Sequence, residues 1–168
     1  MNSAPEIVVE SIVFAARGRD VRYHVLRATW DTQESPEDLV FEENGVAAGP
    51  DTYVHSTSWR LLAPRRIALT YAVIPTAATH DWTTRWLIAP ESASTAPPQP
   101  QNRAALLDID EAEVASHALN HLAWLVRSNP SFVANHCRAT TGEFWNYVGT
   151  RRTEPAGQLF APSVDHDV

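Results

Sequence analysis

The segment from Ile67 to Pro75 constrains the fold of this 168-residue chain more than any other. In a strand, alternate side chains point to opposite faces of the sheet. Both alternating sets are largely apolar here, namely Ile67, Leu69, Tyr71 and Val73 on one side and Ala68, Thr70, Ala72 and Ile74 on the other. An antiparallel strand with two apolar faces needs cover on both sides.

The rest of the first half predicts further strands, because β-branched and aromatic residues are concentrated between turn signals. Arg17-Gly18-Arg19-Asp20 supplies a turn, and Ala63-Pro64-Arg65-Arg66 is a connection of hairpin length. The expected strands are Glu6–Ala16, Val21–Trp30, Thr52–Leu62, Ile67–Pro75 and Trp82–Ala89. We therefore expect two hairpins and a fifth strand.

Helix signals dominate the second half. Asp108 or Asp110 is an expected N-cap for a helix that runs to about Arg127. At 100° per residue its apolar side chains fall in one arc, formed by Ala115, Ala118, Leu119, Leu122, Leu125 and Val126. Shorter helices are predicted at Pro36–Glu42, Pro130–Cys137 and Gly142–Val148. The long helix is expected to pack its apolar arc on the sheet.

These elements predict an α+β fold, an antiparallel sheet of about five strands covered by a long C-terminal helix plus one or two short helices. We expect one domain over residues 1–168, with an internal Pro-rich loop at residues 90–103 and an irregular tail at residues 150–168. The long helix covers only one face of the sheet. To cover the second apolar face, the sheet either curls towards a barrel or meets a partner subunit, and the sequence favours a homodimer.

Composition excludes several kinds of partner. The formal net charge of −7 argues against nucleic acid and anionic membranes, which require basic surfaces. The sequence contains no run of about eighteen apolar residues, so no membrane span is predicted. The single cysteine, Cys137, and an N-terminus without signal-peptide features lead us to expect a cytoplasmic protein. Phosphate-binding glycine patterns are absent from the sequence, which disfavours a nucleotide cofactor and assigns no other.

The most polar stretch of the expected sheet is His55-Ser56-Thr57-Ser58-Trp59-Arg60. Polar groups inside a sheet need partners, so this stretch is the best candidate to line a pocket. Strict alternation would place His55 and Trp59 on one face and Arg60 on the other. The predicted ligand-binding residues are His55, Trp59, Arg60, Tyr71 and Trp86.

A metal site is a second interpretation. Glu113, His117 and His121 repeat every four residues along one ridge of the long helix, and two histidines at this spacing can bind one metal ion. Ala118 occupies the position that a zinc protease fills with glutamate, so that chemistry is not predicted. The third ligand would come from the sheet, with His55 the first choice and His24 the other. The alternative is that these histidines border the core.

Three functions follow as hypotheses. The first is a protein that binds a small ligand in a pocket between the sheet and the long helix, lined by His55, Trp59, Tyr71, His117 and His121. The second is an enzyme in which a metal held by His117, His121 and a sheet histidine activates water. The third is a protein-interaction module that uses exposed tryptophans.

The Pro-rich loop gives a prediction. Mild proteolysis is expected to cut between Pro90 and Arg103, because extended segments poor in apolar residues are preferred cleavage sites. The two fragments should remain associated, as size-exclusion chromatography and mass spectrometry would show. Protein that stays intact under these conditions would show that the loop is packed.

Overall fold

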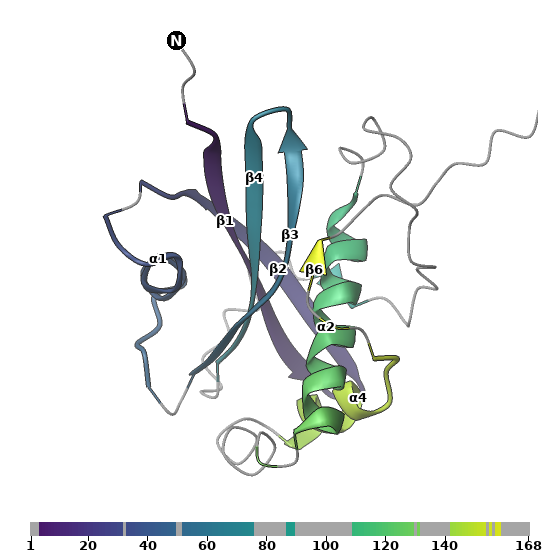
Figure 1. The fold of residues 1–168 in the computed structure, drawn as a ribbon. Coiled ribbons are helices and arrows are strands. Elements are labelled where there is room, and N and C mark those ends of the chain that lie inside the picture. The colour runs from purple at the N-terminus through teal and green to yellow at the C-terminus, as the bar shows by residue number, and fades with distance from the viewer. Residues whose placement is uncertain are drawn as a thin grey trace, which may run out of the picture.

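A computed structural model of the full chain describes most of the expected elements (Figure 1). The described residues are 4–31, 33–49, 52–75, 87–89, 109–129, 131, 142–153, 155 and 157–158. The expected loop at residues 90–103, Trp86, Cys137 and residues 159–168 of the expected tail lie outside them. The same holds for residues 132–137 of the helix expected at Pro130–Cys137.

The described residues form one sheet of six strands in the order β5-β2-β1-β4-β3-β6. The strands are β1 (Glu6–Arg17), β2 (Asp20–Thr29), β3 (Thr52–Ala63), β4 (Arg66–Pro75), β5 (Leu87–Ile88) and β6 (Gly157–Gln158). The expected double-faced strand is β4, which lies inside the sheet between β1 and β3. Both of its faces are covered as expected, since Ala72 and Ile74 lie in one buried cluster and Val73 lies in another.

Both expected hairpins are present, since β1 pairs antiparallel with β2, and β3 with β4. Gly18 makes the first turn with a φ of 64°, a conformation that costs glycine little. The predicted α+β class is confirmed, with one difference in the pairing. The two hairpins join through a parallel pair between β1 and β4, and β6 is parallel to β3. Within the described residues the sheet is open and does not close into the barrel that the sequence offered as one alternative.

Helix α1 (Pro36–Glu43) covers part of one face of the sheet (Figure 1). The Ser35 side chain caps it by accepting a hydrogen bond from the Asp38 backbone, as the sequence predicted. Val40 is fully buried and packs with Val9 and Val13 of β1. A small second core thus covers part of the face for which the sequence predicts cover by a barrel or a partner subunit. The homodimer stays a prediction.

Helix α2 (Glu111–Ser128) covers the opposite face and starts at the expected cap, Asp110 (Figure 1). Asp110 accepts a hydrogen bond from the Glu113 backbone, and Glu113 accepts one from the Asp110 backbone. The main core lies between this helix and the sheet. Its largest fully buried apolar side chains are Ile12, Phe14, Tyr23, Ile74, Leu119, Leu122 and Phe144. The predicted packing of the long helix is confirmed.

Helix α4 (Gly142–Gly149) packs beside α2, and the segment after it is tied to α2 by Arg151. The Arg151 guanidinium is buried and donates hydrogen bonds to Ser116 and Asn120 of α2 and to the Tyr147 hydroxyl. Ser116 and Asn120 of α2 therefore have hydrogen-bond partners in the buried contact with this segment. A purely apolar neighbour would leave them unsatisfied. In the described part of the chain, no helix has the length and apolar character that a membrane span requires.

The core packing gives a second prediction. Leu119→Ala is expected to lower the free energy of unfolding by about 2–5 kcal/mol, because the side chain is fully buried between α2 and the sheet. Denaturant titration followed by circular dichroism would measure the change. Leu26→Ala is the matched control, since Leu26 is only half-buried on β2, and its loss should be clearly smaller. Equal losses would contradict the described core.

Candidate functional site

A β-bulge in β3 decides which polar side chains meet α2. The register shifts between Ser56 and Ser58, so the residues after this point exchange faces relative to strict alternation. His55 and Arg60 therefore lie on the α2 face, whereas Trp59 lies on the α1 face. The prediction that His55 and Trp59 share a face was wrong for this reason.

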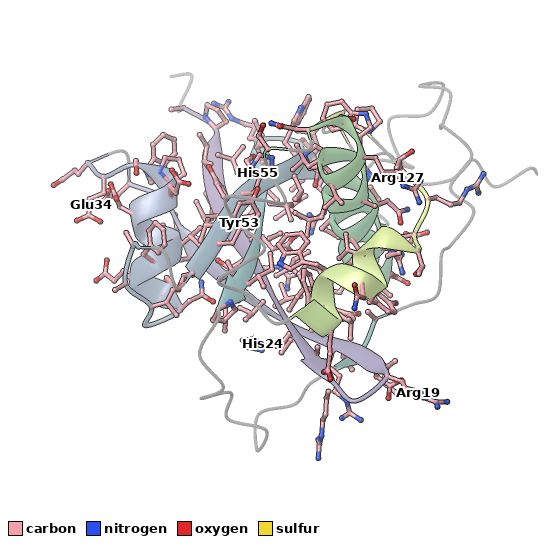
Figure 2. All side chains as sticks on the ribbon, turned by 90° about the horizontal axis from the view of Figure 1, so that it is seen from below. Arg19, His24, Glu34, Tyr53, His55 and Arg127 are labelled. Carbon is pink, nitrogen blue, oxygen red and sulfur yellow. The ribbon has the colours of Figure 1, made fainter. Side chains whose placement is uncertain are left out.

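The clearest contact between the sheet and α2 is a pair of histidines. His55 Nε2 of β3 lies 3.2 Å from His121 Nε2 of α2. One ring can donate a hydrogen bond that the other accepts, so two neutral imidazoles can share one proton at this contact. Figure 2 places His55 and Tyr53 together on the strand beside α2. The structure thus brings together two of the three predicted metal ligands.

Aromatic rings extend this contact in both directions. The Tyr53 and His55 ring centroids are 5.9 Å apart with planes at 12°, and those of His55 and His121 are 5.2 Å apart at 15°. Trp124 continues the row, 5.7 Å from His121 at 18°. Trp145 of α4 closes the Tyr53 end, edge-on at 70°. We call Tyr53, His55, His121 and Trp124 the ring ladder.

His117, the third predicted metal ligand, lies one turn before His121 on α2 and is almost fully buried. Within the described residues, no three side chains of His, Cys, Asp or Glu form a group that could hold a metal ion. The three-histidine set expected from the sequence is therefore not assembled there. His24 lies on the other face of the sheet, opposite Val13 of the α1 core.

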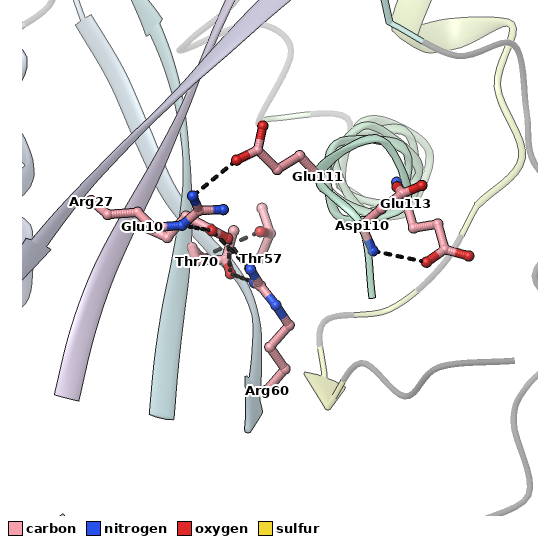
Figure 3. Close-up of polar contacts among 8 residues, drawn as sticks. All are labelled: Glu10, Arg27, Thr57, Arg60, Thr70, Asp110, Glu111 and Glu113. Atoms are coloured by element: carbon pink, nitrogen blue, oxygen red, sulfur yellow. Dashed lines mark hydrogen bonds and ion pairs between the residues drawn. The ribbon is translucent and has the colours of Figure 1, made fainter. Parts of the chain in front are cut away.

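Arg60, another predicted site residue, belongs to a buried ion-pair network (Figure 3). Its guanidinium makes two hydrogen bonds to the Glu10 carboxylate, of 2.6 and 2.8 Å, and a third to the Thr70 hydroxyl. Arg27 also contacts Glu10, at 2.7 Å, and reaches Glu111 at the start of α2, at 2.9 Å. The network crosses four strands and joins them to the helix.

The charge of Glu10 is stabilised in spite of its burial. Only 1% of its surface is exposed, and burial alone would raise the pKa of this carboxyl. The hydrogen bonds and positive charges of Arg60 and Arg27 outweigh burial and hold the pKa of Glu10 below its ordinary value of 4.5. Arg60 thus has a structural partner, and its contact with a ligand stays a prediction.

The remaining predicted ligand-binding residues lie apart from the ring ladder. Tyr71 and Trp59 are on the α1 face, where Tyr71 packs beside the small second core. Burial, and then the charge of Glu37, raises the pKa of Tyr71. Trp86 lies outside the described residues. The Ser58 hydroxyl is buried on the α2 face and makes no hydrogen bond within the described chain.

No local pattern in the sequence singles out Tyr53, Glu10 or Arg27, and Trp124 is only one of six tryptophans. It also did not predict a cavity of about 200 Å³ between the end of β2 and α1. The cavity is lined by Thr29, Trp30, Asp31, Gln33, Glu34, Leu39 and Glu42. Its carboxylates are exposed, so solvent already satisfies them.

Comparisons with known proteins give no match, either to a protein-family model or to a curated protein sequence.

The ion-pair network gives a prediction about pH. Because the pKa of Glu10 is lower in the folded chain, its contribution to stability is complete above about pH 4.5 and is lost as the pH falls through the folded pKa. Denaturant titrations from pH 7 to pH 3 should show this loss. Glu10→Gln should cost about 3–5 kcal/mol at pH 7, since it leaves the arginine charges without their carboxylate, and should flatten the acid dependence.

Glu6→Gln is the matched control for Glu10→Gln. Glu6 pairs with Arg66 at the surface, where both side chains are 47% exposed. Exposed pairs contribute little, so this variant should change stability by less than about 1 kcal/mol. Equal effects of the two variants would contradict the buried network.

Proposed function

We propose that this chain binds a small planar ligand at the seam between β3 and α2. The observation that carries the proposal is the ring ladder, in which successive rings from Tyr53 to Trp124 are tilted by only 12–18°. Other aromatic contacts in the core of this chain are more tilted, as between Phe14 and Tyr23 at 46° and Phe14 and Phe144 at 38°. The outer ring of this near-parallel row, Trp124, can present a flat surface to a flat partner.

The outer end of the ladder is accessible. Trp124 is 38% exposed, whereas His121 beneath it is 2% exposed. A planar molecule can therefore stack on Trp124 without displacing the core, and offset stacking contributes about 0.5–1.5 kcal/mol beyond buried area. The Nε2 atoms of His55 and His121 contact each other beneath Trp124, so the accessible part of the site is its aromatic wall. Binding sites are lined mostly by apolar and aromatic side chains in this way.

The seam also has a rigid support. His121 lies in the part of α2 that is buried throughout, and Tyr53 is fixed between His55 and Trp145. Rings held by packing lose little entropy when a ligand stacks on them. This arrangement favours binding over the enzyme hypothesis, whose three histidines do not form one group within the described residues.

The test uses N-phenyl-1-naphthylamine, a neutral fluorophore with a planar naphthalene ring system, in buffer with EDTA. We expect saturable binding by the full chain, and Trp124→Ala should weaken it about tenfold, the loss of one stacked ring. Trp59→Ala is the matched control, because Trp59 is equally exposed, at 39%, but lies on the other face of the sheet. Binding that is absent, or weakened equally by both variants, would contradict the proposal.

A further inference from the structure

We infer that His55 and His121 form a two-histidine site for a divalent transition-metal ion at the seam between β3 and α2. The inference concerns the same seam as the proposed function. It depends on the two imidazoles and not on the planar ligand, so each proposal can fail without the other.

The distance between the nitrogens fits chelation. Zinc binds imidazole nitrogen at about 2.0–2.1 Å, and a tetrahedral angle between two such bonds separates the nitrogens by roughly 3.3–3.4 Å. The two Nε2 atoms are 3.2 Å apart, which corresponds to an angle of about 100° at the metal. The distance between the nitrogens therefore allows one ion to bind both rings. The ring that carries the shared proton at Nε2 must first change tautomer: it releases this proton to solvent and takes one up at Nδ1, so that both Nε2 lone pairs can bind the ion.

The surroundings hold both rings in place for a metal ion. His55 lies against Tyr53, and His121 lies against Trp124, with near-parallel planes in both pairs. The two ligands come from a strand and a helix that pack on each other, so the pair is formed before any ion arrives. A preformed pair binds more tightly than two mobile side chains, because less entropy is lost.

The donor atoms define the class of ion. Two neutral imidazoles suit Cu²⁺, Ni²⁺ and Zn²⁺, whereas Mg²⁺ and Ca²⁺ prefer oxygen ligands. Among these ions, affinity for nitrogen sites is highest for Cu²⁺. With two protein ligands, the other coordination positions are filled by water or a small ligand. The net charge of −7 adds a general attraction for cations.

The experiment uses the full chain purified without a histidine tag and titrated with Cu²⁺ and with Zn²⁺ by calorimetry at pH 7.5. We expect one ion per chain, bound more tightly as Cu²⁺ than as Zn²⁺. His55→Ala and His121→Ala should each weaken binding by at least about tenfold, because each removes one of two ligands. Electron paramagnetic resonance of the Cu²⁺ complex should show coupling to two imidazole nitrogens.

Two histidine variants serve as matched controls. His24→Ala removes a histidine from the other face of the sheet, and His117→Ala removes the neighbour one turn away on α2. Both should leave affinity unchanged. Weakening by His117→Ala as strong as by His121→Ala, with no effect of His55→Ala, would overturn the inference and place the ion on the helix alone. Absence of binding to the wild-type chain would also overturn it.

Two further measurements keep the inference testable. If circular dichroism shows that His121→Ala is poorly folded, His121→Gln replaces it, because glutamine is polar and similar in length but lacks the imidazole. His121→Gln should also lose metal affinity. The number of nitrogens coupled to Cu²⁺ is measured on the wild-type chain, so this test does not depend on how any variant folds. Coupling to a single nitrogen would overturn the two-histidine site. Binding of N-phenyl-1-naphthylamine in EDTA reports on the planar-ligand proposal alone, so the two outcomes are distinguishable.

Discussion

The packing of α2 on the sheet is the interaction on which the rest of the structure depends. Ten consecutive residues of this helix, Val114–Ala123, are buried. Apolar burial drives the contact but has no direction, so it does not by itself fix how far the helix slides along the sheet. Polar contacts fix the position of the helix along the sheet, because each buried polar group needs a partner at one position. Glu111 meets Arg27, and His121 meets His55, at two points along the helix.

The ion-pair network shows the same logic within the sheet. Glu10 sits on the face of β1 that also carries Ile12 and Phe14, where an unpaired carboxylate would be strongly destabilising. Two bonds from Arg60 and one from Arg27 compensate it. Because these residues come from β1, β2 and β3, a one-residue slip of any strand would break the network. We infer that the network specifies the register of the sheet more than it adds stability.

Local signals made most of the fold predictable. Alternation, turn glycines and capping residues act over a few residues, so the two hairpins and helices α1, α2 and α4 were expected within one or two residues of their bounds. The parallel pairing of β1 with β4 was not, because it joins segments about sixty residues apart and no local pattern records it. The two apolar faces of β4 are covered by the α2 core and the α1 core.

The candidate site was predictable only in part. Helical spacing identified His121, the polar stretch of β3 identified His55, and the metal interpretation placed the two together, as the structure does. The bulge after Ser56 moved Trp59 to the opposite face, and a register shift of one residue leaves no clear mark in the sequence. Tyr53 and Trp124 were missed as partners, because ring contacts across a strand and a helix depend on tertiary packing.

The position of α2 is tested most directly by a double-mutant cycle between His55 and His121, measured as free energies of unfolding in metal-free buffer. Direct contact across the seam predicts a coupling energy of about 0.5–3 kcal/mol between His55→Ala and His121→Ala. Effects that add within about 0.3 kcal/mol would show that the two rings do not touch, and would contradict the described docking of the helix.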